Sequence, residues 1–251
     1  EEKMDLHLKD KVVLVTGGAR GIGLAIAEEF LNEGARVFIS ARNKEEVDAA
    51  VAELSGKGAI SGCITDVSDV SQIKAMVSKC VTDFGGIDIL VNNAGIFPQK
   101  NPLEVTSEEW DLVFDINMRG YMFVAQECAK IMAKKGGSMV NITSIAGVIG
   151  FPTATSYCAT KAGVISLTKS LAMALAPGIR VNAIGPGVID TAMVKDLLAS
   201  EQMNQYLMSK TPLKRVGKPE EIAKVAVFVA SDASSFMTGT TVFVDGGWLT
   251  G

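Results

Sequence analysis

Short runs of consecutive apolar residues alternate along the chain with longer stretches in which apolar positions recur every three or four residues. The first pattern is typical of strands buried on both faces, and the second of helices with one buried face. Strands are predicted at 12–16, 36–40, 59–65, 88–92, 138–143, 179–184 and 241–245. Helices are predicted at 22–31, 44–54, 70–84, 107–134, 156–176 and 220–230, with a bend expected near Gly120.

This order of strands and helices favours parallel pairing with right-handed crossovers. We therefore predict an α/β fold, in which a single doubly wound Rossmann-type domain with a seven-stranded parallel sheet spans residues 1–251. No low-complexity linker or repeat divides the chain. The segment at about 188–212 follows the sixth strand, and we expect it to form a substrate loop or lid.

The composition fits one large core and argues against several kinds of partner. The chain has 251 residues, 48% of them hydrophobic, and a net charge of −4. A nucleic-acid partner is not expected, because no block of Lys and Arg forms a basic face. A membrane span is not expected either, since no run of about 18 apolar residues occurs. The start lacks the apolar stretch of a signal peptide, which favours a cytoplasmic location.

Cysteine and histidine usage points away from metal chemistry. Cys63, Cys80, Cys128 and Cys158 show no C-x-x-C spacing, which favours reduced thiols over a disulfide frame or a zinc site. His7 is the only histidine. We predict no metal site. A Ser-His-Asp mechanism would require His7 itself to reach the site.

The first predicted strand runs directly into the glycine-rich stretch TGGARGIG at 16–23. Gly17, Gly21 and Gly23 follow the spacing G-x-x-x-G-x-G. Glycines at a strand-to-helix turn let the backbone approach a pyrophosphate, whose charge is stabilised at the helix N-terminus. A plain glycine-rich turn is the alternative, but the strand–turn–helix context favours dinucleotide binding.

The end of the second predicted strand indicates which dinucleotide is bound. An acidic residue there would bind the ribose 2′-hydroxyl of NAD(H), but the stretch reads ISARNKEE, with its first acid only at Glu45. Arg42 can form paired hydrogen bonds with a phosphate, and Arg20 can close over the same group. Either arginine alone could be a solvated surface charge. Together they favour NADP(H) over NAD(H).

Two further polar positions follow predicted strands. Asp66 can accept a hydrogen bond from an adenine amino group, or it can serve as a turn or N-cap aspartate. NNAG (92–95) ends the fourth strand, where ligands gather in open parallel sheets. Gly95 would allow a close approach to the cofactor, whereas Asn92 can equally brace neighbouring strands.

Tyr157 and Lys161 lie four residues apart in a predicted helix, so their side chains share one face. An ordinary amphipathic pair is the common reason for this spacing. Ser144, however, ends the fifth strand thirteen residues earlier. An ammonium beside a phenol would stabilise the phenolate and fit the phenol for proton transfer.

With these pieces the sequence resembles the short-chain dehydrogenase/reductase family from end to end. The matching stretches are TGGARGIG, Asp66, NNAG, Asn117, Ser144, SYCATK, GPG (185–187), RVGKPEEIA (215–223) and VDGG (244–247). No single stretch would suffice. The resemblance implies an NADP(H)-dependent oxidoreductase that interconverts a ketone and a secondary alcohol by hydride transfer.

The resemblance also implies a role for each matching side chain. Tyr157 would be the general acid/base, and Lys161 would hold the nicotinamide ribose and lower the pKa of that tyrosine. Ser144 would hydrogen-bond the substrate oxygen, and Asn117 would anchor a water that relays protons to Lys161. The implied cofactor-binding residues are Gly17, Arg20, Gly21, Ile22, Gly23, Ser40, Arg42, Asp66, Val67, Asn93, Ala94, Gly95, Tyr157, Lys161, Pro186, Gly187, Ile189 and Thr191. Thr191 could also be a helix N-cap.

The sequence says less about the substrate. The expected pocket is apolar and suits an apolar ketone, with side chains from Phe97, Gln99, 145–151, Met193, Leu197, Leu207 and Met208. The chain is most similar to 3-oxoacyl-[acyl-carrier-protein] reductases and related carbonyl reductases. Lys130 matches one basic family position, but Met173 replaces a second, so docking of an acyl carrier protein stays open.

Two alternative functions stay open, and a homotetrameric assembly is expected. A polyol or sugar substrate, as in glucose dehydrogenase-like members, would fit the ending VDGGW. A non-catalytic NADP(H)-binding protein would fit the fold but would not need Asn117, Ser144, Tyr157 and Lys161. The resemblance implies a homotetramer joined through the two long helices and the last strand. Trp248 is expected either to be buried against a neighbouring subunit or to be exposed near the chain end.

Overall fold

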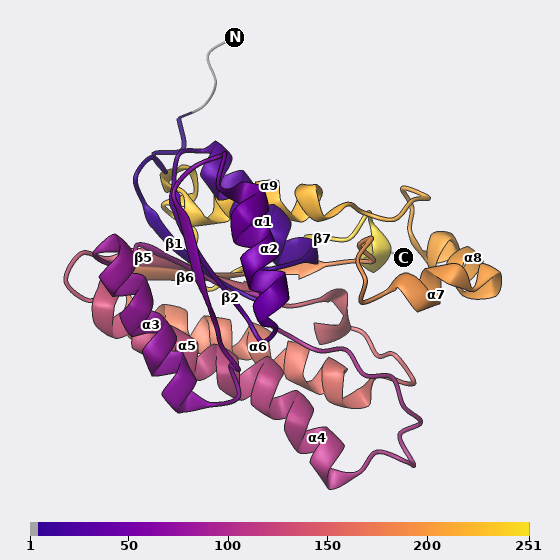
Figure 1. The fold of residues 1–251 in the computed structure, drawn as a ribbon. Coiled ribbons are helices and arrows are strands. Elements are labelled where there is room, and N and C mark those ends of the chain that lie inside the picture. The colour runs from indigo at the N-terminus through magenta and orange to yellow at the C-terminus, as the bar shows by residue number, and fades with distance from the viewer. Residues whose placement is uncertain (1–4, 251) are drawn as a thin grey trace.

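Seven parallel strands form one sheet in the order β3-β2-β1-β4-β5-β6-β7 (Figure 1). The computed structural model describes residues 5–250. All neighbouring strands pair in parallel, which confirms the predicted fold class. The strands are β1 (Val12–Thr16), β2 (Arg36–Ala41), β3 (Ile60–Ile64), β4 (Ile89–Asn92), β5 (Gly137–Ile142), β6 (Ile179–Pro186) and β7 (Thr241–Val244).

Helices cover both faces of this sheet (Figure 1). One face carries α1 (Gly21–Asn32), α2 (Lys44–Leu54) and α9 (Pro219–Ala230), and the other carries α3 (Val70–Phe84), α5 (Gly120–Met132) and α6 (Thr155–Leu175). Alternate residues of one strand enter the two cores. Val13 and Val15 pack toward α1, whereas Val12 and Leu14 pack toward α3 and α5. Burial on both faces explains why the strands are uninterrupted apolar runs.

The long helix predicted at 107–134 is divided by one wider turn. It consists of α4 (Ser107–Phe114), a π-helical turn (Asp115–Arg119) and α5. The expected bend at Gly120 is therefore replaced by a π turn that ends just before it, and such turns are frequent at functional sites. At Gly120 a β-carbon would lie 2.9 Å from the carbonyl oxygen of Val67, so the helix approaches the loop after β3 closely.

The segment 188–212 forms two short helices, α7 (Lys195–Ala199) and α8 (Glu201–Lys210), which lie beyond one end of the sheet (Figure 1). Trp248 packs beneath them with Ile145 and Leu207 and is only 6% exposed. The exposed alternative for Trp248 is therefore wrong, because the chain itself buries the indole, whereas its contact with a neighbouring subunit stays a prediction.

The strand order leaves a crevice at the carboxyl end of the sheet. From β1 the chain crosses to β2 and β3 on one side, and then returns to β4 on the other side of β1. The loops after β1 and β4 consequently run in opposite directions. Ligands of open parallel sheets bind at such a reversal.

All four cysteines are free thiols. Within residues 5–250, no helix is both long and apolar enough to cross a membrane.

Arg180 ties the end of α9 to the sheet. It lies on β6 and is half-buried. Its guanidinium donates five hydrogen bonds to the carbonyl oxygens of Val229, Ala230, Ser231 and Met237 and to the hydroxyl of Ser234. Three of these carbonyls belong to the C-terminal end of α9 and the residue that follows it, where helical acceptors lack partners of their own.

We expect the substitution Arg180→Lys to lower the free energy of unfolding by about 2–3 kcal/mol, because one ammonium cannot satisfy five separated acceptors. Urea unfolding followed by circular dichroism measures this loss. The matched control is Arg36→Lys, since half-buried Arg36 also lies on a strand but its guanidinium donates hydrogen bonds to a single carbonyl, that of Asp10, among the described residues. Equal, small losses in both variants would contradict the structural role of Arg180.

Candidate active site

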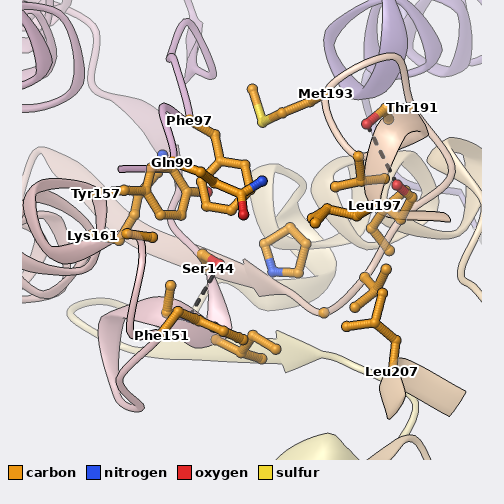
Figure 2. A pocket seen from close by; sticks show the side chains of 18 of the residues that line it. Phe97, Gln99, Ser144, Phe151, Tyr157, Lys161, Thr191, Met193, Leu197 and Leu207 are labelled. Atoms are coloured by element: carbon orange, nitrogen blue, oxygen red, sulfur yellow. Dashed lines mark hydrogen bonds between the residues drawn. The ribbon is translucent and has the colours of Figure 1, made fainter. Parts of the chain in front are cut away.

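A cavity of about 650 Å³ opens at the carboxyl ends of β4, β5 and β6 (Figure 2). Its walls come from the loops that follow these strands, from α6 and from the 188–212 segment. Ten of the predicted site residues line it: Ile22, Asn93, Gly95, Ser144, Tyr157, Lys161, Pro186, Gly187, Ile189 and Thr191. The predicted catalytic and nicotinamide-binding positions therefore meet in one place, apart from Asn117.

Ser144 follows β5 and begins a 3-10 turn (Ile145–Gly147). Its backbone is extended, and its hydroxyl oxygen accepts a hydrogen bond from the amide of Ala146 at 3.1 Å (Figure 2). This N-cap bond fixes the side-chain rotamer at the cavity wall. The hydroxyl also lies close enough to the phenol of Tyr157 to lower the pKa of that phenol. The two hydroxyl groups thus form a pair at one edge of the cavity.

Tyr157 lies in the first turn of α6 and is half-buried. Its ring packs edge-on against Phe97, with 4.6 Å between the ring centroids (Figure 2). Burial raises the pKa of Tyr157 to about 12, and the nearby Ser144 hydroxyl acts in the opposite direction. The lowered pKa that the family resemblance implies is therefore not found here. In this structure burial outweighs the stabilisation of the phenolate.

Lys161 is almost completely buried, with 4% of its surface exposed. Its amine donates hydrogen bonds to the carbonyl oxygen of Ile142 at 2.9 Å and to the hydroxyl of Tyr121 at 3.4 Å. The amine lies 5.6 Å from the ring centroid of Tyr157. Burial lowers the pKa of Lys161 to about 7. The predicted pair therefore shares one buried region, although no direct hydrogen bond joins its two polar ends.

Asn117 lies in the π turn and is completely buried. Its side-chain oxygen accepts from the amide of Ile96 at 2.9 Å, and its side-chain nitrogen donates to the carbonyl of the same residue at 2.9 Å. The nitrogen also lies 3.4 Å from the hydroxyl of Thr160 on α6. Asn117 therefore clamps the loop after β4 against α6. The proton-relay role implied by the resemblance stays a prediction.

The glycine loop is shaped for close approach. Gly17 has a φ of +63°, and a β-carbon there would lie 2.9 Å from the Cα of Ala94. A β-carbon on Gly23 would lie 2.1 Å from the carbonyl oxygen of Gly17. At the start of α1, the side chain of Arg20 makes no capping hydrogen bond, and the first turn has no acidic residue. The free amide donors of this helix end fit a pyrophosphate group.

The NNAG segment holds this loop in place. The amides of Asn93 and Ala94 both donate to the hydroxyl of Thr16, at 3.0 and 3.2 Å, and the Asn93 side chain donates to the carbonyl of Gly17 at 3.0 Å. Asn92 instead donates to the side chain of Asn141 and to the backbone of Tyr121. The bracing role that we considered for Asn92 is thus confirmed.

The carboxyl end of β2 presents an unpaired hydroxyl and two arginines. The Ser40 hydroxyl is buried and has no hydrogen-bond partner. Arg42 is exposed and forms no ion pair with any part of the chain that the structure describes. Arg20, in contrast, pairs with Glu46 at 3.0 Å. An anionic group placed here could therefore use exposed Arg42 directly, whereas Arg20 would first have to leave Glu46 and the buried Ser40 hydroxyl would first have to become accessible.

Asp66 and Val67 are placed by local structure. One carboxylate oxygen of Asp66 accepts from the amide and the hydroxyl of Ser68, at 2.9 and 2.7 Å, so the turn role is present. Asp69, not Asp66, caps α3. Val67 is buried in the core between α3 and α5. Neither residue lines the cavity, and their adenine-binding roles stay predictions.

The start of the 188–212 segment, which follows β6, lies next to the glycine loop. Ile189 pairs with Gly217 in an isolated bridge, which fixes its backbone. The methyl carbon of Thr191 would lie 3.4 Å from a β-carbon on Gly21. The Thr191 hydroxyl lies 3.4 Å from the carbonyl of Ile189, and α7 begins only at Lys195. The N-cap role considered for Thr191 is therefore wrong.

Apolar side chains form the rest of the cavity. Those expected from the sequence and found there are Phe97, Phe151, Met193, Leu197 and Leu207 (Figure 2). Met208, which was also expected, packs instead with the cluster around Trp248. Met203 and Tyr206 of α8 were missed. Met203 lies four residues before Leu207, so helical periodicity would have placed it on the same face of the helix and indicated that it lines the cavity. Tyr206 directly precedes Leu207 and gave no such signal.

The arrangement can bind a polar oxygen at one wall and apolar groups at the others. Ser144 and Tyr157 supply two hydroxyl donors, whereas the opposite wall is largely hydrocarbon. Two converging donors suit a carbonyl oxygen on which negative charge develops. Among residues 5–250, no cluster of three His, Cys, Asp or Glu side chains could hold a metal ion.

Comparison with known proteins gives consistent matches over nearly the whole chain. The family model described as enoyl-(acyl carrier protein) reductase matches residues 17–249. The 3-oxoacyl-[acyl-carrier-protein] reductase FabG of Thermotoga maritima is 43% identical over 245 residues, which cover 96% of this chain and 99% of that protein. The FabG of Staphylococcus aureus is 40% identical over 241 residues, covering 94% and 97% of the two chains.

Solved structures agree with these sequence matches. A short-chain type dehydrogenase/reductase from Mycobacterium marinum superimposes with a TM-score of 0.93 at 35% identity, over 97% of each chain. A protein from Sinorhizobium meliloti superimposes with a TM-score of 0.95 at 36% identity, over 98% of this chain and 99% of that one. With its parallel sheet, its glycine loop and the cavity where Ser144, Tyr157 and Lys161 meet, the chain belongs to the short-chain dehydrogenase/reductase family.

Proposed function

We propose that the protein is an NADP(H)-dependent reductase that converts an apolar ketone, of the 3-oxoacyl class, into a secondary alcohol. One observation carries this proposal: Ser144, Tyr157 and Lys161 meet at one wall of a cavity that also includes the loop after β6 and the start of α1. The 188–212 segment supplies an apolar wall, and we propose that it acts as a lid on this single domain.

The chain's own residues suit the dinucleotide. The open N-terminus of α1 and the close-packed glycines would hold the pyrophosphate. Exposed Arg42 would bind the 2′-phosphate. Arg20 would join it on leaving Glu46, and the unpaired Ser40 hydroxyl would join it once the end of β2 opens. The Ile189 backbone and Thr191 would hold the nicotinamide carboxamide. NADPH, when bound, supplies the hydride for the carbonyl carbon.

The protein's part in the reaction is to place and protonate the carbonyl oxygen. Ser144 donates a hydrogen bond to that oxygen and holds it beside Tyr157. The O–H bond of Tyr157 then breaks and its proton moves to the oxygen, which leaves a phenolate that solvent reprotonates. The positive charge of the Lys161 ammonium, which lies near the Tyr157 ring, stabilises this phenolate.

The protonation state of Tyr157 favours reduction. With its pKa raised to about 12, the phenol carries its proton at neutral pH. It can therefore donate a proton to a ketone oxygen directly. The reverse reaction needs the phenolate as a base, and that form becomes common only when the pH approaches this value. Alcohol oxidation should accordingly require a much higher pH than reduction.

The relatives and the cavity together favour a 3-oxoacyl substrate. The FabG proteins of Thermotoga maritima and Staphylococcus aureus are both named for 3-oxoacyl reduction. The cavity walls formed by Phe151, Leu197 and Leu207 suit an acyl chain better than a polyol. The matching family model is described by enoyl reduction instead, so a 2-enoyl thioester is the second candidate substrate.

Recognition of an acyl carrier protein has weaker support. Lys130, at one of the expected basic positions, pairs with Glu127 at 2.6 Å. Met173, at the other, is 84% exposed and carries no charge. An acidic partner would gain little electrostatic attraction here. We therefore propose that small thioesters or free ketones are reduced as readily as carrier-linked ones, in the cytoplasm.

We expect Tyr157→Phe to lower the rate of ketone reduction by about 10²- to 10⁴-fold, because the phenyl ring cannot donate a proton. The measurement is loss of NADPH absorbance with a panel containing a 3-oxoacyl thioester, a small apolar ketone, a 2-enoyl thioester and, with NADP⁺, a polyol. Equal rates for both proteins would defeat the assigned role of Tyr157. A wild-type protein that binds NADPH but turns over no substrate would favour a non-catalytic binding protein.

Cofactor choice gives a second prediction. Arg42→Asp should weaken NADPH binding by about tenfold or more relative to NADH, because it removes a charge-assisted hydrogen bond and adds repulsion. Titrations that follow NADPH and NADH fluorescence give both dissociation constants. Lys224→Asp on α9 is the control, since exposed Lys224 makes the same change of charge on a helix that packs against α1, β5 and β6. An unchanged ratio of the two constants in Arg42→Asp would place the phosphate elsewhere.

We also propose that the protein is a homotetramer. Apolar side chains on the two long helical segments support this, because Leu112 on α4 is 49% exposed and Met173 on α6 is 84% exposed. Faces of this kind are commonly covered by another subunit. Light scattering should give about four times the chain mass of 26.4 kDa. A species of 26.4 kDa alone would remove the proposal.

A further inference from the structure

Tyr121 is a buried tyrosine directly beside Lys161. It is 1% exposed and lies near the start of α5, one residue after Gly120. Its hydroxyl donates a hydrogen bond to the carbonyl oxygen of Ile142 at 2.9 Å. Tyr121 is not among the residues that line the cavity. Any influence on the reaction must therefore pass through a neighbour.

That neighbour is the amine of Lys161. The Ile142 carbonyl accepts from the Tyr121 hydroxyl and from the Lys161 amine, each at 2.9 Å. The hydroxyl hydrogen points to the carbonyl, so the hydroxyl oxygen is free to accept from the amine, which lies 3.4 Å away. The three groups form a triangle that holds the amine at two points and limits its rotamers.

The same contacts favour the charged form of Lys161. The groups facing its amine are the Ile142 carbonyl from β5, the Tyr121 hydroxyl and ring from α5, and the Tyr157 ring from α6. No carboxylate of residues 5–250 pairs with it. The amine lies 5.2 Å from the centroid of the Tyr121 ring. The face of the Tyr121 ring and a lone pair of its hydroxyl oxygen both stabilise the Lys161 ammonium. They therefore oppose the lowering of the Lys161 pKa by burial.

The backbone at Tyr121 is itself fixed. Its carbonyl accepts a hydrogen bond from the side chain of Asn92 at 3.1 Å, and Asn92 also donates to Asn141 on the neighbouring strand. Gly120 packs against Val67 with no room for a side chain. Contacts with β4, β5 and the loop after β3 therefore hold the backbone of Tyr121 in a fixed position.

We propose that Tyr121 is a positioning residue, which holds the Lys161 amine in place through the shared Ile142 carbonyl and keeps it protonated. The consequence for turnover rests on the proposed function, whereas the contact and its effect on Lys161 do not.

The direct test is the titration of Lys161 in Tyr121→Phe, which removes the hydroxyl and keeps the ring. The Cε resonance of Lys161, in protein labelled with ¹³C-lysine and assigned by its loss in Lys161→Met, reports the charge of the amine. We expect the pKa of Lys161 to fall by about one unit, the size of one hydrogen bond to a charged group. Tyr206→Phe removes a phenolic hydroxyl from α8 and should leave the titration unchanged.

Kinetics supply the second readout. In Tyr121→Phe, kcat for ketone reduction at pH 7 should fall several-fold, and KM for the ketone should stay within about twofold, because the cavity wall is unchanged. The basic limb of the pH–rate profile should move to lower pH by the same interval as the Lys161 titration. A loss of packing alone would move neither the limb nor the titration.

The outcomes separate this inference from the proposed function. Thermal melting first establishes that Tyr121→Phe is folded, and Tyr121→Met, which lacks both ring and hydroxyl, replaces it if it is not. The pKa of Lys161 should then fall by more than about one unit from the wild-type value, because the ring face is lost together with the hydroxyl. An identical Lys161 titration in the wild type and the folded variant would overturn the inference. A shifted titration in a protein that reduces no ketone would leave the Tyr121 inference standing and remove the proposed function.

Discussion

The site depends on a lysine amine held inside the protein. Burying an ammonium is costly unless polar partners replace water, and burial alone lowers the pKa of Lys161 to about 7. The Ile142 carbonyl at the end of β5 and the Tyr121 hydroxyl provide those partners. The pairing of β4 with β5 ends at Asn92 and Asn141, so the Ile142 carbonyl lies one residue past this ladder and can accept from side chains. Ser144 follows two residues later, which couples the hydroxyl donor to the same strand.

The uncharged amide side chains of three asparagines hold the surrounding loops in place. Asn117 binds both backbone groups of Ile96, Asn93 binds the glycine loop, and Asn92 links β4 to β5 and α5. Each of these side chains satisfies backbone groups that no neighbouring strand pairs. The cavity is therefore shaped before a ligand arrives, and a preorganised site needs little rearrangement when charge develops on a substrate oxygen.

Much of this could be predicted from the sequence, because it depends on local patterns. Apolar runs fixed the strands to within one or two residues, and the spacing of Ser144, Tyr157 and Lys161 placed them together. Properties that depend on three-dimensional burial could not be predicted in this way. The raised pKa of Tyr157, the π turn at Asn117 and the burial of Trp248 all depend on which segments pack around them. Tyr121 was missed because a helical tyrosine usually signals nothing beyond the core.

The central claim is that the Tyr157 phenol, backed by a buried lysine amine, faces the nicotinamide across a gap that admits a carbonyl group. A crystal structure of the complex with NADP⁺ tests this most directly. The account predicts the phenol oxygen of Tyr157 on the nicotinamide side of the cavity, within reach of the Ser144 hydroxyl, and the Lys161 amine still bound to the Ile142 carbonyl. A nicotinamide ring bound outside the cavity, or a phenol turned away from it, would contradict the account.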